Sequence, residues 1–385
     1  MGPSVAWPPA ALCLAAALAG AALGNPIQSK DCPPREQVST KVMVHYMIWF
    51  GEPMTRHWIW CNSSYFNRMT MGCNNTQHLA TRYPPVDGAF ASYDPEHIAR
   101  DVQLMKSHCV DGIIIDYQQP PDLPGRSIID RALPLVVEAV VGAGLEFAIM
   151  YDASSKRDWG RDAGEAAGVE ADWRKIITLA SGHRESYLQD AAGNLMFFLF
   201  GATPPPTDGD ACPGRAERGC AFYAQDANDR SDLADAPGQA GAFAWIEPPK
   251  GPPLEYLGRF YRLKCSAMFP GSPTPCVGAA FVGMEAVYPS HGIIPRSADL
   301  LREGLELCDL HGVVCQVPTW NDFNEGTHIQ PSYWCNGDEP SAYLQVIRDF
   351  KRRRLLGDER LQRDQQQPPA ERPPGGGQHV AVARA

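Results

Sequence analysis

The chain has 385 residues, a formal net charge of −10 at pH 7, and a composition that is 44% hydrophobic and 9% aromatic. Its length allows one large domain with tails or two smaller domains, and the absence of a linker near the middle favours one domain. Nucleic acid and anionic membrane surfaces require basic patches, so this acidic chain is not expected to bind either. Nine tryptophans favour a protein that stacks sugar rings on indole faces.

The N-terminus carries a predicted targeting segment. Residues 10–23 form an Ala-rich apolar run that ends in Ala22-Leu23-Gly24, small residues of the kind a signal peptidase reads. We therefore predict a signal peptide over 1–24, a polar lead-in over 25–40, and secretion or residence in the secretory lumen. An uncleaved anchor is the alternative, although the run lacks a basic start and is short for a membrane span.

Cysteines and sequons agree with that compartment. Eleven of the twelve cysteines follow the signal, and this usage is typical of oxidising environments. Three pairs are close in sequence and are predicted disulfides, although spacing alone does not determine connectivity: Cys61/Cys73, Cys212/Cys220 and Cys265/Cys276. Three others lie in apolar patterns and are interpreted as small core residues, not metal ligands: Cys109, Cys308 and Cys315. Asn62-Ser63-Ser64 and Asn74-Asn75-Thr76 are glycosylation sequons, which predict a glycoprotein.

Apolar runs alternate with helical patterns along the chain. The runs predict strands at 41–50, 112–117, 145–152, 195–200, 242–246, 265–269, 279–287 and 313–317. The helical patterns lie at 95–105, 128–141, 171–180, 254–263, 298–310 and 342–355, with Asp94 and Ser297 as N-caps. A Pro-, Gly- and Asp-rich stretch at 202–238 is predicted to be a loop insertion, and 356–385 a disordered tail. About eight strand–helix units predict a (β/α)8 TIM-type barrel over 41–355.

The stretch from Thr319 to Pro331 directly follows the last predicted strand and contains two acids among amides and aromatic residues. Asp322 and Glu325 are three residues apart, so they share one face only if the chain turns, and neighbouring Asn and Gly residues permit such a turn. Trp320 and Phe323 would supply walls of low dielectric that raise the pKa of one carboxyl group. A protonated acid beside an ionised carboxylate cleaves glycosidic bonds. The alternative is a surface turn whose acids are solvated.

Two further acids end predicted strands. Asp116 follows the run that begins at Gly112, and Asp152 follows the run that begins at Leu145. Barrel enzymes place their chemistry at these carboxyl ends, although a strand-end acid can also cap the following helix. The chain contains neither a metal-ligand spacing nor a Gly-rich phosphate loop, so no metal or cofactor is predicted.

With these residues identified, the chain resembles glycoside hydrolase family 99, the endo-α-mannosidases, and related family 71/99-like proteins. Five colinear stretches carry the resemblance: His45 to Phe50 with His57-Trp58, Ser92 to Pro95 leading into Leu104 to Lys106, Asp111 to Tyr117, Phe147 to Asp152, and Thr319 to Pro331. Members of that family are (β/α)8 barrels. Similarity to them implies a secreted, retaining, endo-acting α-glycosidase whose partner is an oligo- or polysaccharide.

The resemblance also implies roles for individual residues. Glu325 would be the general acid/base, and Asp322 would deprotonate the sugar's own 2-hydroxyl to form a 1,2-anhydro sugar. The residues that would bind substrate are His45, Tyr46, His57, Trp58, Asp116, Tyr151, Asp152, Trp320 and Asn321. Endomannosidases of the family have Glu at the position of Asp322, and Trp-His where this chain has Phe323-Asn324. Family 71 α-1,3-glucanases therefore remain an alternative for specificity.

Structural interpretations stay open for some of these residues, as do two other functions for the chain. His45 alternatively serves as a core histidine beneath the barrel mouth, and Trp58 as a packing residue. Some glycosyltransferase-like proteins carry a similar motif, and a non-catalytic carbohydrate-binding protein would keep the same aromatic residues.

Overall fold

The computed structural model describes residues 32, 40–52, 56–58, 79–118, 124–153, 166–201, 219–226, 240–245, 251–265, 276–287, 293–311, 313–333 and 341–353. The predicted signal peptide, most of the lead-in, the sequons and the predicted tail lie outside these residues.

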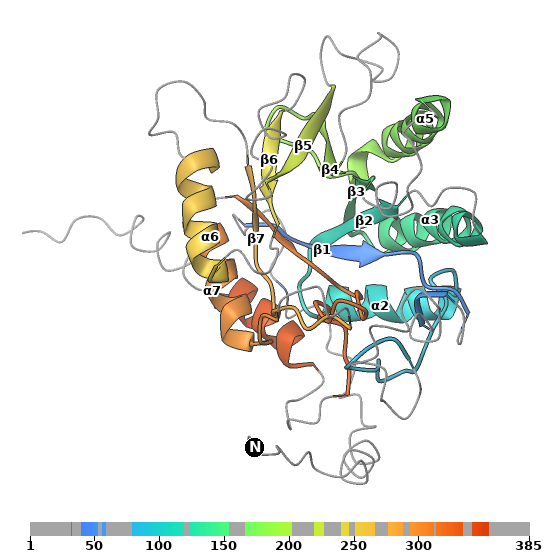
Figure 1. Cartoon of the computed structure of the whole chain (residues 1–385). Coiled ribbons are helices and arrows are strands. Elements are labelled where there is room, and N and C mark those ends of the chain that lie inside the picture. Colours follow the sequence, from blue (N-terminus) through green and yellow to red (C-terminus); the bar gives the residue numbers. More distant parts are fainter. Residues whose placement is uncertain are drawn as a thin grey trace, which may run out of the picture.

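Eight parallel strands close into a barrel in sequence order, each hydrogen-bonded to the next and β8 to β1. The strands are β1 (Val42–Met47), β2 (Gly112–Gln118), β3 (Glu146–Asp152), β4 (Leu195–Phe200), β5 (Cys220–Asp226), β6 (Gly241–Ala244), β7 (Cys276–Ala279) and β8 (Val314–Val317). This closed parallel barrel confirms the predicted (β/α)8 fold. Figure 1 shows the helices arranged around it.

The helices that cover the barrel follow the predicted patterns. They are α2 (Pro95–Ser107), α3 (Pro124–Gly142), α5 (Ala166–Gly182), α6 (Pro253–Phe260) and α7 (Ala298–Leu310), with short turns η3 (Arg56–Trp58), η6 (Arg184–Ser186) and η8 (Tyr261–Cys265). Residues 342–353 are also helical. Asp94 caps α2 by accepting a hydrogen bond from the backbone N–H of Glu96, and Ser297 caps α7 by accepting from Asp299 and Leu300, so both predicted N-caps are confirmed.

The sequence predicted eight strands but misplaced part of the set. Strand β5 lies inside the stretch 202–238 that was predicted to be a loop, and the flanking Pro- and Gly-rich sequence hid its apolar pattern. The predicted strand at 265–269 is wrong at Cys265, which ends the π-helical turn η8, and its other residues lie outside the described part of the chain. Strand β7 begins at Cys276, so the prediction at 279–287 was placed too late. The missed strand β5 and the incorrectly predicted strand at 265–269 cancel, so the predicted number of strands is still eight.

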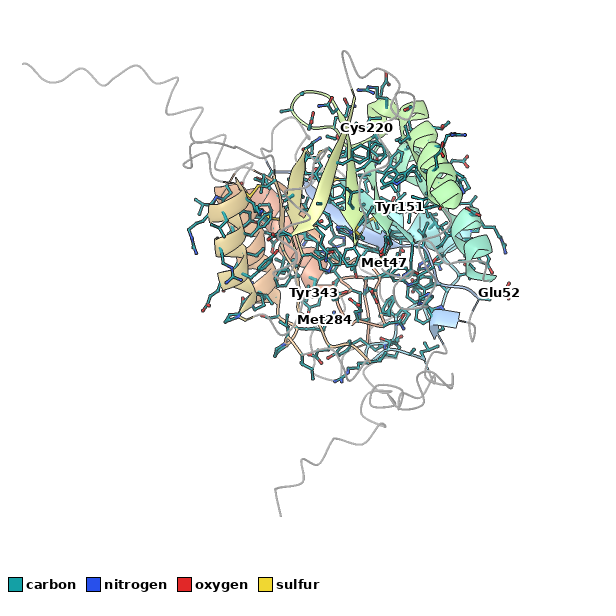
Figure 2. The ribbon with its side chains drawn as sticks, turned by 45° about the horizontal axis from the view of Figure 1, so that its top comes forward. Met47, Glu52, Tyr151, Cys220, Met284 and Tyr343 are labelled. Carbon is teal, nitrogen blue, oxygen red and sulfur yellow. A yellow bond between two sulfur atoms is a disulfide. The ribbon has the colours of Figure 1, made fainter. Side chains whose placement is uncertain are left out.

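Strand register decides which side chains face the barrel interior. His45 of β1 lies beside Ile114 of β2, and Met47 lies beside Asp116. Because paired residues of neighbouring strands point to the same face and successive residues alternate, one parity class fills the barrel and the other packs against the helices. Figure 2 labels Met47, a member of the interior class, near the centre of the barrel.

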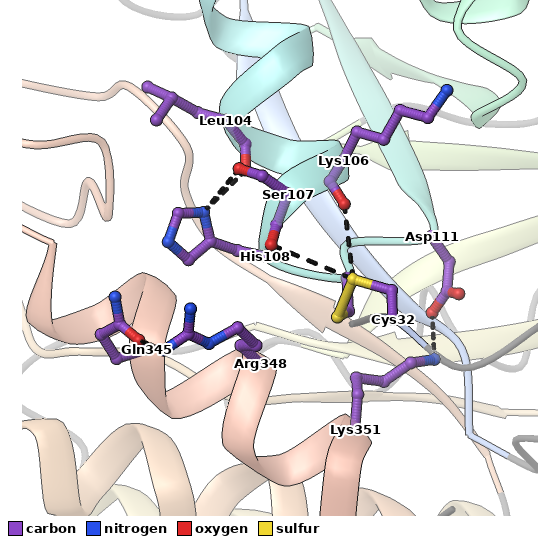
Figure 3. The surroundings of a disulfide bond; sticks show 10 residues. Cys32, Leu104, Lys106, Ser107, His108, Asp111, Gln345, Arg348 and Lys351 are labelled. Carbon is purple, nitrogen blue, oxygen red and sulfur yellow. Dashed lines mark hydrogen bonds and ion pairs between the residues drawn. A yellow bond between two sulfur atoms is a disulfide. The ribbon is translucent and has the colours of Figure 1, made fainter. Parts of the chain in front are cut away.

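The end of the barrel opposite the strand carboxyl ends is closed by an ion pair and a disulfide. Lys351, on the helix at 342–353, lies 2.6 Å from Asp111 Oδ2, and both side chains are buried. The same Asp111 oxygen accepts a hydrogen bond from the backbone N–H of Val42 at 2.7 Å. Cys32 is joined to Cys109 after α2 (Figure 3). These contacts fix the closing helix and the residue at position 32 to the barrel.

The disulfides differ in part from those predicted. Cys265–Cys276 is present as expected. Cys308 is bonded to Cys315, so these two and Cys109 are buried as predicted but do not remain free thiols. Cys220 is also disulfide-bonded, whereas Cys61, Cys73 and Cys212 lie outside the described residues. Within the described residues no helix is both long and apolar enough to cross a bilayer.

Gly304 provides a test of the close packing between α7 and the barrel. A Cβ atom there would lie 2.8 Å from Ala280 Cα, whereas a Cβ at Gly142 in α3 would meet nothing within 4 Å. We expect Gly304→Ala to lower the free energy of unfolding by about 1–3 kcal/mol, because an overpacked interface forces the backbone to shift. The matched control Gly142→Ala should be neutral or slightly stabilising. Denaturant unfolding measures both, and equal losses would contradict this account of the packing.

Candidate active site

After β8 the chain forms a turn that is anchored over β1. The backbone N–H of Trp320 donates to the carbonyl of His45 at 2.6 Å, and the Asn321 side chain pairs with both the N–H and the carbonyl of Met47. The two limbs of the turn also bond to each other, since Thr319 N donates to the carbonyl of Thr327 at 3.2 Å. The turn is thus held rigidly at the carboxyl ends of the strands.

Asp322 is buried at the start of this turn, with 4% of its surface exposed. Its Oδ1 accepts a hydrogen bond from the backbone N–H of Glu325 at 3.0 Å, and its own N–H donates to Thr319 Oγ1 at 2.9 Å. Burial raises the pKa of Asp322 to about 6, and hydrogen bonds from the backbone N–H groups of Glu325 and Asn324 act in the opposite direction. The turn therefore contains several Asx contacts, as in the surface-turn alternative, but the Asp322 carboxyl group is buried and not solvated.

Two strand-end acids face the same region. Asp116 lies beside Met47 in register, and Asp152 lies beside Gln118, so both belong to the interior class. Burial, followed by the negative charges of Asp152, Asp322 and Glu325, raises the pKa of Asp116 well above its ordinary value. Asp116 Oδ1 is buried, and no residue in the described part of the chain hydrogen-bonds to it. Four carboxyl groups thus interact at the carboxyl end of the barrel.

Glu325 is partly exposed and lines a cleft. The other lining residues are mostly apolar: Trp245, Phe281, Gly283, Met284, Ile294, Pro318, Thr319 and Thr327. Trp245 was not singled out from the sequence. Its position two residues after Phe243, an interior residue paired with Gln225 of β5, was the available clue, because side chains alternate along a strand.

His45 lies beneath this cleft as a buried, neutral side chain. Its Nε2 donates to Oε1 of Gln316 at 2.6 Å, and its ring meets the Trp245 ring edge-on at 5.1 Å between centroids. Burial lowers the pKa of His45 to about 4, with the Gln316 hydrogen bond opposing the shift. The side chain has no exposed surface, so it supports the floor of the site and does not line an open subsite. Gln316 was missed because an amide inside an apolar strand gave no motif.

Tyr46 and Tyr151, predicted to bind substrate, face the helices on the outer side of the barrel. Tyr46 donates its hydroxyl to Asp101 of α2 at 3.0 Å, and Tyr151 stacks on Trp173 of α5 at 4.8 Å. Each is one residue from an interior position, and a shift of one residue along a strand changes the face. Substrate binding by either tyrosine stays a prediction, and neither is used in the proposal below.

Three other predicted binding residues are occupied by structural contacts. Trp58 is fully buried against Phe50, Phe90 and Phe323 and donates its Nε1–H to the Phe90 carbonyl. Trp320 has no exposed surface, and the amide of Asn321 is used by Met47. Substrate binding stays a prediction for the six residues described so far: His45, Tyr46, Trp58, Tyr151, Trp320 and Asn321.

His57 is also buried, stacked on Trp49 at 5.1 Å, and its carbonyl accepts a hydrogen bond from Asn324 of the turn. Its role in substrate binding stays a prediction. No cluster of His, Cys, Asp or Glu in the described ranges could hold a metal ion.

The chain resembles several solved structures in fold. No protein-family model and no curated protein matches the chain. A solved family 99 endo-α-mannosidase from Bacteroides thetaiotaomicron matches with a TM-score of 0.59 and 14% identity, over 81% of this chain and 98% of that one. A structure with that description in complex with Bis-Tris propane gives 0.60 and 12%, over 84% and 98%. A glycoside hydrolase-like protein gives 0.55 and 11%, over 85% and 97%.

The chain has the fold of these proteins. The match spans nearly the whole length of each neighbour, so it includes the whole barrel and not a local motif. At such low identity the likeness establishes architecture only, and residue roles must be argued from this chain's own geometry.

Proposed function

We propose that the protein is a glycoside hydrolase that cleaves α-linked glycans, with Glu325 as general acid/base and Asp322 as its partner. The observation that carries this proposal is the cluster of four carboxyl groups at the carboxyl end of the barrel, where Asp322 has a pKa near 6. A general base is most effective when its pKa lies near the working pH, and a carboxyl pair is the machinery of glycosidic cleavage.

The proposed reaction retains anomeric configuration through the sugar's own 2-hydroxyl. Asp322 removes the 2-hydroxyl proton while that oxygen attacks the anomeric carbon, and Glu325 donates its proton to the departing glycosidic oxygen. Glu325 then removes a proton from water, whose oxygen opens the 1,2-anhydro ring at the anomeric carbon, and Asp322 returns its proton to O2. Two inversions give net retention.

Asp116, Asp152 and Trp245 are the proposed substrate contacts. Burial and the neighbouring negative charges raise the pKa of Asp116 and so favour its protonated form, in which it would donate a hydrogen bond to a sugar hydroxyl through an oxygen that no described residue engages. The half-buried Trp245 indole borders the cleft beside Glu325 and suits the C–H face of a pyranose. An oligo- or polysaccharide is the proposed partner.

The α-mannosidic linkage is the first candidate, since family 99 neighbours share the fold. An α-1,3-glucan is the second candidate, because the shorter Asp322 stands where endomannosidases have Glu. In an α-glucoside O2 is cis to the glycosidic oxygen and cannot attack from the opposite face, so the 2-hydroxyl route described above applies to the α-mannoside alone. Two other functions predict different results: a non-catalytic carbohydrate-binding protein would bind these glycans without cleaving them, and a glycosyltransferase-like protein would require a sugar nucleotide.

The test is to incubate the purified, disulfide-intact protein with α-mannan and α-1,3-glucan oligosaccharides and to identify the products. We expect internal cleavage of one class, and an initial product with the α configuration by proton NMR. An initial β product would exclude the retaining route. Binding without cleavage of any oligosaccharide would favour the carbohydrate-binding alternative.

A further inference from the structure

The second limb of the turn, residues 326–330, has one backbone edge bonded within the turn. Ile329 N donates to the carbonyl of Thr319 at 3.0 Å, and the Thr327 carbonyl accepts from Thr319 N. The alternate carbonyls of Gly326 and His328 therefore face the other edge. Both accept hydrogen bonds from the side chain of Arg296, through Nη1 and through Nη2, the latter at 2.7 Å.

The guanidinium group of Arg296 lies near two aromatic rings. Its central carbon lies 4.8 Å from the ring centroid of Tyr83 and 5.2 Å from that of Tyr343. Tyr83 is itself fixed, because its hydroxyl donates to Glu285 Oε2 at 2.6 Å. Arg296 Nη1 also lies 3.3 Å from Nδ1 of His328, whose pKa burial and the nearby guanidinium charge lower well below the ordinary value. His328 is therefore neutral and can accept that hydrogen bond.

The same group of residues reaches the backbone of Glu325. Glu285 accepts a hydrogen bond from Arg296 N at 3.4 Å, and its own N–H donates to the Glu325 carbonyl at 3.0 Å. Gly326 adopts a φ of 65°, and a Cβ there would lie 2.7 Å from the Glu285 carbonyl oxygen. The peptide that follows Glu325 is thus confined between Glu285 on one side and the guanidinium on the other.

We propose that Arg296 is a positioning residue, which fixes the turn so that the Glu325 carboxyl group faces the cleft. The inference rests on the proposed hydrolase function. Lysine cannot replace Arg296, because an ammonium group lacks the planar fork that bonds two carbonyls and lies against aromatic rings at the same time. Arg296 lies behind the turn and acts through the backbone of Gly326 and His328.

The experiment compares Arg296→Lys and Arg296→Ala with Arg302→Ala, an exposed α7 arginine that pairs with Asp299. Because a displacement of about 1 Å can cost about 10²-fold, we expect kcat per folded molecule to fall by about 10²-fold in both Arg296 variants, with KM within threefold. Guanidinium at millimolar concentration should raise the kcat of Arg296→Ala at least tenfold. It should leave the kcat of Arg296→Lys unchanged. Arg302→Ala should retain wild-type values.

Amide hydrogen exchange across 319–330 provides a readout that does not depend on turnover. We expect faster exchange in Arg296→Ala than in Arg302→Ala, and recovery with guanidinium. A kcat within twofold of wild type per folded molecule, or unchanged exchange, would overturn the proposal. If the wild-type protein cleaves no glycan, the hydrolase function fails, and the exchange result alone decides whether Arg296 holds the turn.

Discussion

Replacing Glu325 by Gln is expected to reduce kcat/KM on an oligosaccharide by about 10³-fold, because general acid/base catalysis contributes about 10²–10⁴. The amide keeps the size of the side chain but cannot donate a proton to the departing oxygen. The loss should be much smaller for cleavage of an activated aryl α-glycoside, whose leaving group departs without protonation. Steady-state kinetics on the two substrate types measures the difference.

Glu306→Gln is the matched control. Glu306 is an exposed α7 residue that pairs loosely with Arg353 at 3.6 Å, so its substitution should leave both rates unchanged. If Glu325→Gln lost the same factor on both substrate types, the acid role would have to be abandoned. If it kept full activity on the oligosaccharide, Glu325 would be excluded from the chemistry altogether.

Asp322→Asn is expected to lower kcat/KM by about 10²–10⁴ on both substrate types, because a base that activates the 2-hydroxyl is needed whatever the leaving group. In the wild type, kcat/KM should rise with pH through about 6, where Asp322 loses its proton. The variant should lack this limb of the profile. Asp299→Asn, at the exposed start of α7, should keep the wild-type profile.

The same substitution is expected to stabilise the protein at alkaline pH. Burial raises the folded-state pKa of Asp322 to about 6 from its ordinary value near 3.8, so this group favours folding below the lower value and loses that contribution as pH rises through 6. The difference corresponds to a penalty of about 3 kcal/mol for the ionised form. Asparagine carries no charge and can still accept the Glu325 N–H bond.

Thermal unfolding from pH 4 to pH 8 tests this expectation. The Tm of Asp322→Asn minus that of the wild type should increase with pH, and the Asp299→Asn difference should stay flat. A difference that decreases with pH would mean that the carboxylate is stabilised in the folded state, contrary to the effect of burial. Lost activity combined with gained stability would identify Asp322 as a strained functional group.

Local patterns were sufficient for much of the architecture. The N-caps Asp94 and Ser297, the apolar runs of β1 to β4 and the acid that ends β3 all depend on neighbours in the chain, so the sequence predicted them correctly. Strand β5 was missed because a run of seven residues inside Pro- and Gly-rich sequence resembles a loop until the barrel supplies strands on both sides.

For the candidate site, too, the sequence predicted relations between neighbours in the chain but not relations between distant elements. Sequence spacing placed Asp322 and Glu325 on one turn, because that relation is local. It could not separate Tyr46 from His45 or Tyr151 from Asp152, since adjacent strand residues look equally suitable and only strand register assigns their faces. It also could not identify Trp245 or Arg296, which reach the turn from elements distant in the chain. The sequence by itself determined the barrel and the acid pair; the tertiary structure decided which side chains surround them, because strand pairing and burial exist only in the folded chain.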